Sequence, residues 1–159
     1  MIAPGDEIGR KHPPHFTATD RFNTSTIIFL TVCTKNRKPI LANDSSHELL
    51  KKAWRTRPAW LVGRYVIMPD HVHLFCAPAR PDSLPLTDWV EFWKSHVARN
   101  WFARSQVPIW QRHFWDTQLR RGENYDGKWE YVLQNPVRAG LTRPDEDWTF
   151  QGELNVLDW

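Results

Sequence analysis

The fold of this chain depends on the stretch Tyr65-Val66-Ile67-Met68-Pro69-Asp70-His71-Val72-His73-Leu74-Phe75. Its central Pro-Asp pair is typical of a tight turn, and apolar, β-branched and aromatic residues flank that pair, so the stretch predicts a β-hairpin. Side chains two residues apart in a strand share a face, which places His71 beside His73 and turns Val72 and Leu74 the other way. Two parallel imidazoles form half of a metal site. The alternative is that one or both histidines hydrogen-bond to backbone carbonyls within the sheet.

The composition is that of an ordinary folded domain. The chain has 159 residues, of which 41% are hydrophobic and 25% charged, and this length suits a single domain over residues 1–159. A net charge of +3 and a pI of about 9.0 favour a polyanionic partner. Cys33 and Cys76 lie in apolar runs and are expected to be buried free thiols, as in a reducing cytoplasm. With no apolar segment suited to a signal peptide or a membrane span, we expect a cytoplasmic protein without membrane contact.

The rest of the chain alternates short strands with helices. Apolar and β-branched runs predict strands at 26–33, 60–67, 71–77 and 114–120. Apolar periodicity and capping residues predict helices at 43–54, 86–102 and 123–134, followed by a turn that Gly140 closes. This order predicts an α+β fold, an antiparallel sheet with helices packed on it. Residues 1–22 are expected to form a mobile N-terminal arm, and residues 142–159 a tail that packs on the domain.

The helix predicted at 86–102 has one apolar face. Its apolar positions fall on a single stripe at helical spacing: Leu86, Trp89, Val90, Trp93, Val97 and Trp101. Lys94 and Arg99 lie largely off this stripe. They are therefore expected at the surface, either as a solvated face or as contacts to a polyanion.

The helix predicted at 123–134 carries Tyr131, and Asn135 follows one turn later on the same side. If this side faces the histidines, the site contains two imidazoles, one amide oxygen and one phenol. Such nitrogen and oxygen donors suit a divalent ion with open positions for substrate oxygens. A tyrosine hydroxyl placed in line with a phosphodiester can form a covalent phosphotyrosine. The alternatives are that Tyr131 is a core residue with a surface hydroxyl and that Asn135 is only a turn residue before proline.

Two motifs of this chain carry a resemblance to a known family. The first is His71-Val72-His73, two histidines around a hydrophobic residue. The second is Trp110-Gln111 with Phe114, Asp116 and Arg120, followed by Tyr131-Val132-Leu133-Gln134-Asn135-Pro136-Val137-Arg138-Ala139-Gly140-Leu141. Together they resemble the HUH motif and the second signature of REP-associated tyrosine transposases, which belong to the IS200-like, single-tyrosine (Y1) transposase family. The resemblance extends from about residue 20 to the C-terminus.

This resemblance implies a ferredoxin-like fold with the HUH motif on a sheet strand and the catalytic tyrosine on a late helix. It implies a transposase that cleaves and rejoins single-stranded DNA at REP-like hairpins through a 5′-phosphotyrosine, with Mg²⁺ or Mn²⁺ as cofactor. By position, His71, His73 and Asn135 are the metal ligands and Tyr131 is the nucleophile. The candidate DNA-binding residues are Lys94, Arg99, Arg112, Arg120, Arg121 and Arg138. A monomer and a homodimer both stay open.

The chain also departs from the family pattern. Thr117 stands where many relatives have histidine, and the tail segment Asp147-Trp148-Thr149-Phe150-Gln151 differs from their common Asp-Trp-Pro-Tyr-Ser-Ser. Tyr125 is a rival nucleophile, ranked second because nearby glycines suggest a loop. Two other functions stay open. One is a non-catalytic module that binds DNA or RNA hairpins. The other is an unrelated metallohydrolase, which is disfavoured because Phe75 occupies the place of the aspartate in H-x-H-x-D.

Overall fold

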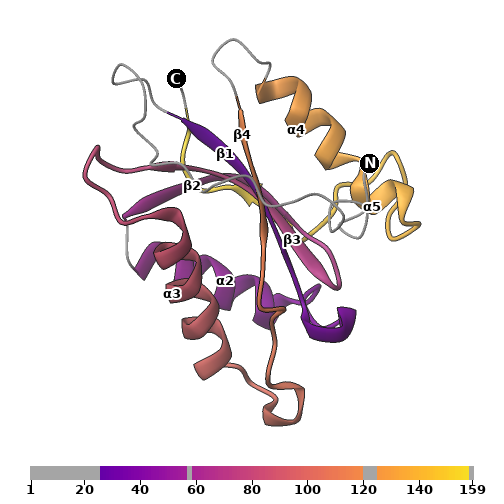
Figure 1. Cartoon of the computed structure of the whole chain (residues 1–159). Helices are drawn as coiled ribbons and strands as arrows, with labels where there is room; N and C mark the ends of the chain where they lie inside the picture. The colour runs from indigo at the N-terminus through magenta and orange to yellow at the C-terminus, as the bar shows by residue number, and fades with distance from the viewer. Residues whose placement is uncertain (1–25, 57–58, 120–124, 158–159) are drawn as a thin grey trace.

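The computed structural model describes residues 26–56, 59–119 and 125–157 (Figure 1). The arm expected at 1–22 and the candidate residues Arg120 and Arg121 lie outside these ranges. Five strands are assigned: β1 (Ile27–Cys33), β2 (Trp60–Ile67), β3 (His71–Pro78), β4 (Trp115–Leu119) and β5 (Gln151–Glu153). The helices are α2 (Asp44–Thr56), α3 (Leu86–Arg99), α4 (Tyr125–Leu133) and α5 (Asn135–Arg138), with short 3₁₀ turns η1 (Lys35–Arg37) and η2 (Arg104–Gln106).

The strands form one antiparallel sheet in the order β4-β1-β3-β2-β5. The chain order β1-α2-β2-β3-α3-β4, with β4 beside β1 and β3 between β1 and β2, is the ferredoxin-like arrangement. The predicted α+β fold is therefore confirmed. β5 was not expected, because Gln151–Glu153 is too short and polar to show a strand pattern. It pairs with β2, and the Trp148 indole nearby donates a hydrogen bond to the Ile67 carbonyl.

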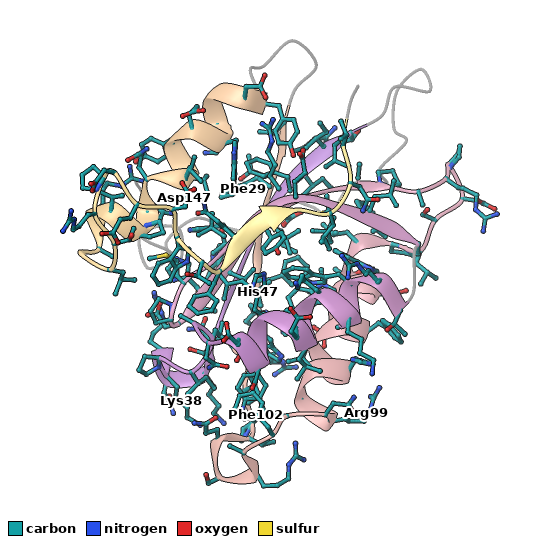
Figure 2. All side chains as sticks on the ribbon, turned by 180° about the vertical axis from the view of Figure 1, so that it is seen from behind. Phe29, Lys38, His47, Arg99, Phe102 and Asp147 are labelled. Atoms are coloured by element: carbon teal, nitrogen blue, oxygen red, sulfur yellow. The ribbon has the colours of Figure 1, made fainter. Side chains whose placement is uncertain are left out.

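Helices cover both faces of the sheet. Figure 1 shows α2 and α3 together on one side and α4 with α5 on the other. The larger core lies under α2 and α3 and includes Leu30, Leu74 and Trp93. The smaller core lies under α4 and includes Phe29, Phe75 and Val132. Figure 2 shows Phe29 beside α4, where Lys128 Nζ lies 4.9 Å from the centre of the Phe29 ring.

β3 is buried on both faces, and its side chains alternate between the two cores. Val72 and Leu74 belong to the core under α2 and α3, while Phe75 belongs to the core under α4. Alternation along the strand therefore places His71 and His73 on the α4 and α5 side. The predicted hairpin and the shared face of the two histidines are both confirmed, since β2 and β3 flank the Pro69-Asp70 turn and pair antiparallel.

The ends of the first two helices follow from their caps. Asn43 caps α2, because its Oδ1 accepts a hydrogen bond from the Ser46 amide at 2.9 Å, as its side chain predicts. α3 ends at Arg99 and not at Phe102 as predicted. Asn100 follows the last helical residue, and its side-chain amide donates a hydrogen bond to the His96 carbonyl at 2.8 Å. Trp101 is still buried, but it lies beyond the helix.

The segment after α4 is a second short helix closed by glycine. Gly140 has φ of 73°, its amide donates to the Val137 carbonyl, and the Leu141 amide donates to the Pro136 carbonyl. These two bonds form the Schellman motif, which needs a left-handed residue that glycine adopts without strain. The predicted closing glycine is confirmed. No helix in the described ranges is long and apolar enough to cross a membrane.

Candidate metal and nucleic-acid site

The two histidines of β3 lie side by side under α4 and α5. Their ring centroids are 4.7 Å apart, and both side chains are buried, with 4% of His71 and 2% of His73 exposed. The Phe29 ring of β1 stacks on His73 with centroids 5.2 Å apart. The strand thus holds both imidazoles side by side, and the stacked Phe29 ring adds support to His73.

Each histidine is oriented through its Nδ1 atom. His71 Nδ1 donates to Asp70 Oδ1 at 2.7 Å, because a carboxylate can only accept. His73 Nδ1 forms a hydrogen bond of 2.8 Å with Thr31 Oγ1 of β1. The Nε2 atom of each ring is buried and has no hydrogen-bond partner among the described residues. For His71, a proton on Nδ1 leaves a lone pair on Nε2, the form of imidazole that binds metals.

The surroundings favour neutral imidazoles. Burial lowers the pKa of His71, although Asp70 opposes this effect. The pKa of His73 is lowered well below its usual value by burial, and by His71, Lys128, Arg37 and Arg138 nearby. Both rings therefore remain uncharged near neutral pH.

A pocket opens beside His71. Its volume is about 410 Å³, and its wall includes Arg37, Asp70, His71, Asn135 and Arg138. α5 therefore brings Asn135 to the same pocket as the first histidine, as the sequence predicts. Asn135 is 2% exposed, and its Nδ2 has no hydrogen-bond partner in the described ranges.

Arg138 connects Asn135 with Tyr131. Its Nη2 donates to Asn135 Oδ1 at 2.6 Å and to the Tyr131 carbonyl at 2.7 Å. Its guanidinium carbon lies 4.6 Å from the centre of the Tyr131 ring, in cation–π contact. Tyr131 itself is 44% exposed, so its ring lies at the rim of the molecule and not in the core. The phenol thus stays accessible while Arg138 holds its ring.

The other helical tyrosine has a different environment. Tyr125 is the first residue of α4 and not a loop residue as its neighbouring glycines suggested. Its hydroxyl accepts a hydrogen bond from the Arg64 amide at 3.3 Å, and its ring packs on Phe75 with centroids 4.9 Å apart. Burial raises the pKa of Tyr125, with Arg64 opposing. These contacts explain Tyr125 as a packing residue between α4 and β2.

The residues at the pocket fit a divalent metal. Two unpaired, buried imidazole nitrogens are unusual in a folded protein, and a metal would satisfy them. No group of three or more His, Cys, Asp or Glu side chains in the described part of the chain could hold a metal. Asn135 lines the pocket beside His71, and its amide oxygen, which accepts the 2.6 Å hydrogen bond from Arg138, is the candidate third ligand. Nitrogen and oxygen donors of this kind suit a divalent ion with positions open to substrate oxygens.

The model of the IS200-like transposase family matches residues 23–121, which is more than half of the chain. The chain belongs to this family. The matched range contains His71 and His73, whereas Tyr131 and Asn135 follow it.

Individual relatives of this IS200-like chain agree with the family match. A protein of Escherichia coli K12 called REP-associated tyrosine transposase is 27% identical over 126 residues, covering 77% of this chain and 73% of the relative. A Haemophilus influenzae protein is 24% identical over 160 residues, covering 87% of this chain and 89% of that protein. A solved structure of a REP-associated tyrosine transposase bound to a REP hairpin matches with a TM-score of 0.65 and 24% identity, covering 82% of this chain and 79% of that chain. At that identity the structural match shows the fold.

The basic residues predicted to contact DNA in this IS200-like chain lie in different environments. Arg99, Arg112 and Arg138 are exposed. Lys94 is buried, contrary to its expected position off the apolar stripe of α3. Its Nζ donates to the Gln111 carbonyl at 2.8 Å and to the Arg112 carbonyl at 3.4 Å, because the segment before β4 crosses α3 at this point.

Three residues of the site were not among the sequence candidates. Thr31 and Asp70 orient the histidines, and Arg37 contacts Asp70. Asp70 adjoins the histidines in the sequence, which is a local signal. Thr31 and Arg37 lie 42 and 33 residues from the partners they contact, so no local pattern identifies them.

The structure also places Thr117, the residue that differs from the histidine of many relatives. β4 pairs with β1 so that Thr117 lies opposite Phe29 and Trp115 opposite Thr31. Directly paired residues share a face of the sheet. Thr117 is therefore on the histidine-bearing face, at an exposed position of the edge strand.

Proposed function

We propose that this protein is a metal-dependent transposase that cleaves and rejoins single-stranded DNA at REP-like hairpins through a 5′-phosphotyrosine. In this proposal Tyr131 is the nucleophile, and His71, His73 and Asn135 hold Mg²⁺ or Mn²⁺. The family match and the relative named as a REP-associated tyrosine transposase support the reaction class. The solved relative bound to a REP hairpin supports the kind of DNA.

One observation carries the proposal. Two neutral imidazoles on one strand each present a buried, unpaired Nε2, and Asn135 lines the pocket beside His71. A purely structural histidine would satisfy both ring nitrogens, because an unpaired buried polar atom is costly. The arrangement is explained if these atoms bind something that is not part of the chain.

The proposed chemistry combines the histidine pair with Tyr131, which contacts the pocket residue Arg138. A bound Mg²⁺ or Mn²⁺ would act as a Lewis acid toward a phosphoryl oxygen. The Tyr131 oxygen attacks the phosphorus of the DNA backbone and gives up its proton, and the bond from that phosphorus to the 3′ oxygen breaks. The 3′ oxygen takes a proton and leaves as a 3′-OH, while the 5′ phosphate stays on Tyr131. Attack by a 3′-OH on the phosphotyrosine reverses these steps, so rejoining needs no ATP.

The exposed arginines are the proposed DNA contacts. Arg138 lies at the pocket wall beside Tyr131, where a backbone phosphate would approach. Arg99 and Arg112 are exposed; Arg99 is the last residue of α3, and the Arg112 carbonyl accepts a hydrogen bond from Lys94 of the same helix. Arginine pairs well with phosphate oxygens, and such contacts position DNA without reading its sequence. Arg120 and Arg121 stay predictions from the sequence alone.

A covalent-adduct assay tests the proposal. Labelled single-stranded hairpins from the flanks of the protein's own gene are incubated with the protein in Mn²⁺ or in EDTA and separated on a denaturing gel. We expect an adduct in Mn²⁺ only, lost in Tyr131→Phe and kept in Tyr125→Phe. Tyr125→Phe is the matched control, because it removes a hydroxyl from the same helix.

Two outcomes would change the proposal. An adduct that survives Tyr131→Phe but not Tyr125→Phe would transfer the nucleophile to Tyr125. Hairpin binding without adduct in any metal, and unchanged by His71→Ala, would establish a non-catalytic hairpin-binding module on this fold.

A further inference from the structure

Arg37 contacts the first histidine of the pair through Asp70. Arg37 Nε and Nη2 lie 3.0 Å and 2.9 Å from Asp70 Oδ2. The other oxygen, Oδ1, accepts the proton of His71 Nδ1 at 2.7 Å. Both carboxylate oxygens are thus engaged, and three side chains form a continuous series from Arg37 to His71. All three also line the pocket of about 410 Å³ that Asn135 borders.

The backbone that carries Arg37 has an uncommon conformation. Asn36 and Arg37, consecutive residues in the turn after β1, have φ of 57° and 53°. Asparagine tolerates the left-handed region, but a long side chain such as arginine rarely occupies it. Lys38, labelled in Figure 2, directly follows this turn. Backbone strain of this kind persists where the side chain it positions makes an important contact.

The β2–β3 turn does not depend on the guanidinium. The Thr34 amide donates to the Asp70 carbonyl at 3.0 Å, and the single proton of the Thr34 hydroxyl is shared between the Lys38 carbonyl at 2.9 Å and the Asp70 carbonyl at 3.1 Å. The Leu41 amide donates to the Pro69 carbonyl at 2.9 Å. These bonds attach the turn to the segment after β1 through backbone acceptors. The contact of Arg37 with the Asp70 carboxylate is therefore an addition to bonds that already hold the turn.

We infer that Arg37 is a positioning residue for the metal-binding histidine. Arg37 binds one carboxylate oxygen of Asp70, and this orients the other oxygen toward His71 Nδ1. The hydrogen bond from Nδ1 then fixes the rotation of the His71 ring and keeps its proton on Nδ1 rather than on Nε2. The inference rests on the proposed metal role of His71. The Nδ1 atom of His73 is held by the hydroxyl of Thr31 and not by a charged pair, so the orienting contact of Arg37 through Asp70 is made with His71.

Metal binding without DNA tests the inference. Mn²⁺ affinity is measured by calorimetry for wild type, Arg37→Ala, Arg37→Lys and the control Arg143→Ala. Arg143 also pairs with acidic side chains, but it is exposed and is not part of the pocket wall. We expect Arg37→Ala to weaken Mn²⁺ binding about 10- to 100-fold, the usual effect of losing a residue that supports a metal ligand. Arg37→Lys should recover part of this loss, and Arg143→Ala should bind like wild type.

A second measurement separates positioning from folding. Long-range ¹H–¹⁵N spectra of the metal-free proteins report which ring nitrogen of His71 carries the proton. In wild type we expect it on Nδ1, and in Arg37→Ala a measurable fraction on Nε2. Equal Mn²⁺ affinity and an unchanged tautomer in a folded Arg37→Ala protein would overturn the inference while leaving the metal site intact. His71→Ala is expected not to bind Mn²⁺. If wild type also fails to bind Mn²⁺, the proposed metal role of His71 fails, and the inference fails with it.

Discussion

Replacing Lys94 with methionine should weaken the fold and leave hairpin binding unchanged. Methionine keeps the apolar stem of the side chain but removes the ammonium, which donates to the carbonyls of Gln111 and Arg112. Burial lowers the pKa of Lys94, with Glu91 opposing, so part of the gain from these bonds is offset by desolvation of the charge. The two carbonyls lose their donor in the variant.

The magnitude follows from these contacts. A hydrogen bond to a charged group contributes about 1.5–3 kcal/mol. Since only the 2.8 Å bond to Gln111 is short and desolvation offsets part of it, the net loss in unfolding free energy should be about 2 kcal/mol. For a chain of 159 residues this loss corresponds to a Tm lower by about 4–8 °C.

Urea unfolding followed by tryptophan fluorescence measures the stability change, because Trp110 donates its indole hydrogen bond to the Lys94 carbonyl. Fluorescence anisotropy with a labelled hairpin measures binding. Arg99→Met is the matched control on the same helix. It is exposed, so it should leave stability unchanged, and it should weaken binding if Arg99 contacts phosphate. A Lys94→Met protein that is as stable as wild type but binds the hairpin at least about tenfold more weakly would refute this reasoning and restore the DNA-contact role.

Further changes test separate parts of the structure. Gly140→Ala should lower the free energy of unfolding by about 1 kcal/mol in urea, because the residue has φ of 73°, which alanine adopts only with strain. No atom lies within 4 Å of the added Cβ, so a steric clash contributes nothing. An unchanged urea midpoint would contradict the left-handed conformation. Burial raises the pKa of Tyr65 to about 12, so the folded state holds this proton more tightly than the unfolded state and loses stability as pH rises above about 10. Tyr65→Phe should therefore lose less stability than wild type between about pH 9 and about pH 11, and an equal loss would refute the assignment. Thr31→Val removes the partner of His73 Nδ1 and should weaken Mn²⁺ binding about 10- to 100-fold in calorimetry, whereas unchanged affinity would show that Thr31 does not support the ligand.

Local patterns predicted much of the fold. The period of two along β3 predicted that His71 and His73 share a face, and the structure confirms it. The capping side chain of Asn43 and the closing Gly140 were also visible, because both act on backbone groups a few residues away. The edge strand β5 had no such signal, since a short polar segment forms a strand only when a neighbouring strand is present to pair with it.

The candidate site was predicted in part. The sequence suggested the histidines, Asn135 and Tyr131, and the structure brings Asn135 and His71 to one pocket. It did not suggest that Arg138 would contact both Asn135 and the Tyr131 ring. The helical spacing of these residues permits that contact, but other rotamers of arginine would point into solvent.

The sequence alone determined the features that depend on residues close together in the chain. These are the hairpin, the shared face of the histidines, the helix caps and the order of elements. These follow from backbone geometry and side-chain periodicity, which act locally. Tertiary structure alone decided that Lys94 is buried, that Thr31 orients His73, and that Arg37 contacts Asp70. Such contacts join residues that are distant along the chain, and they exist only after the sheet and the turns have brought those side chains together.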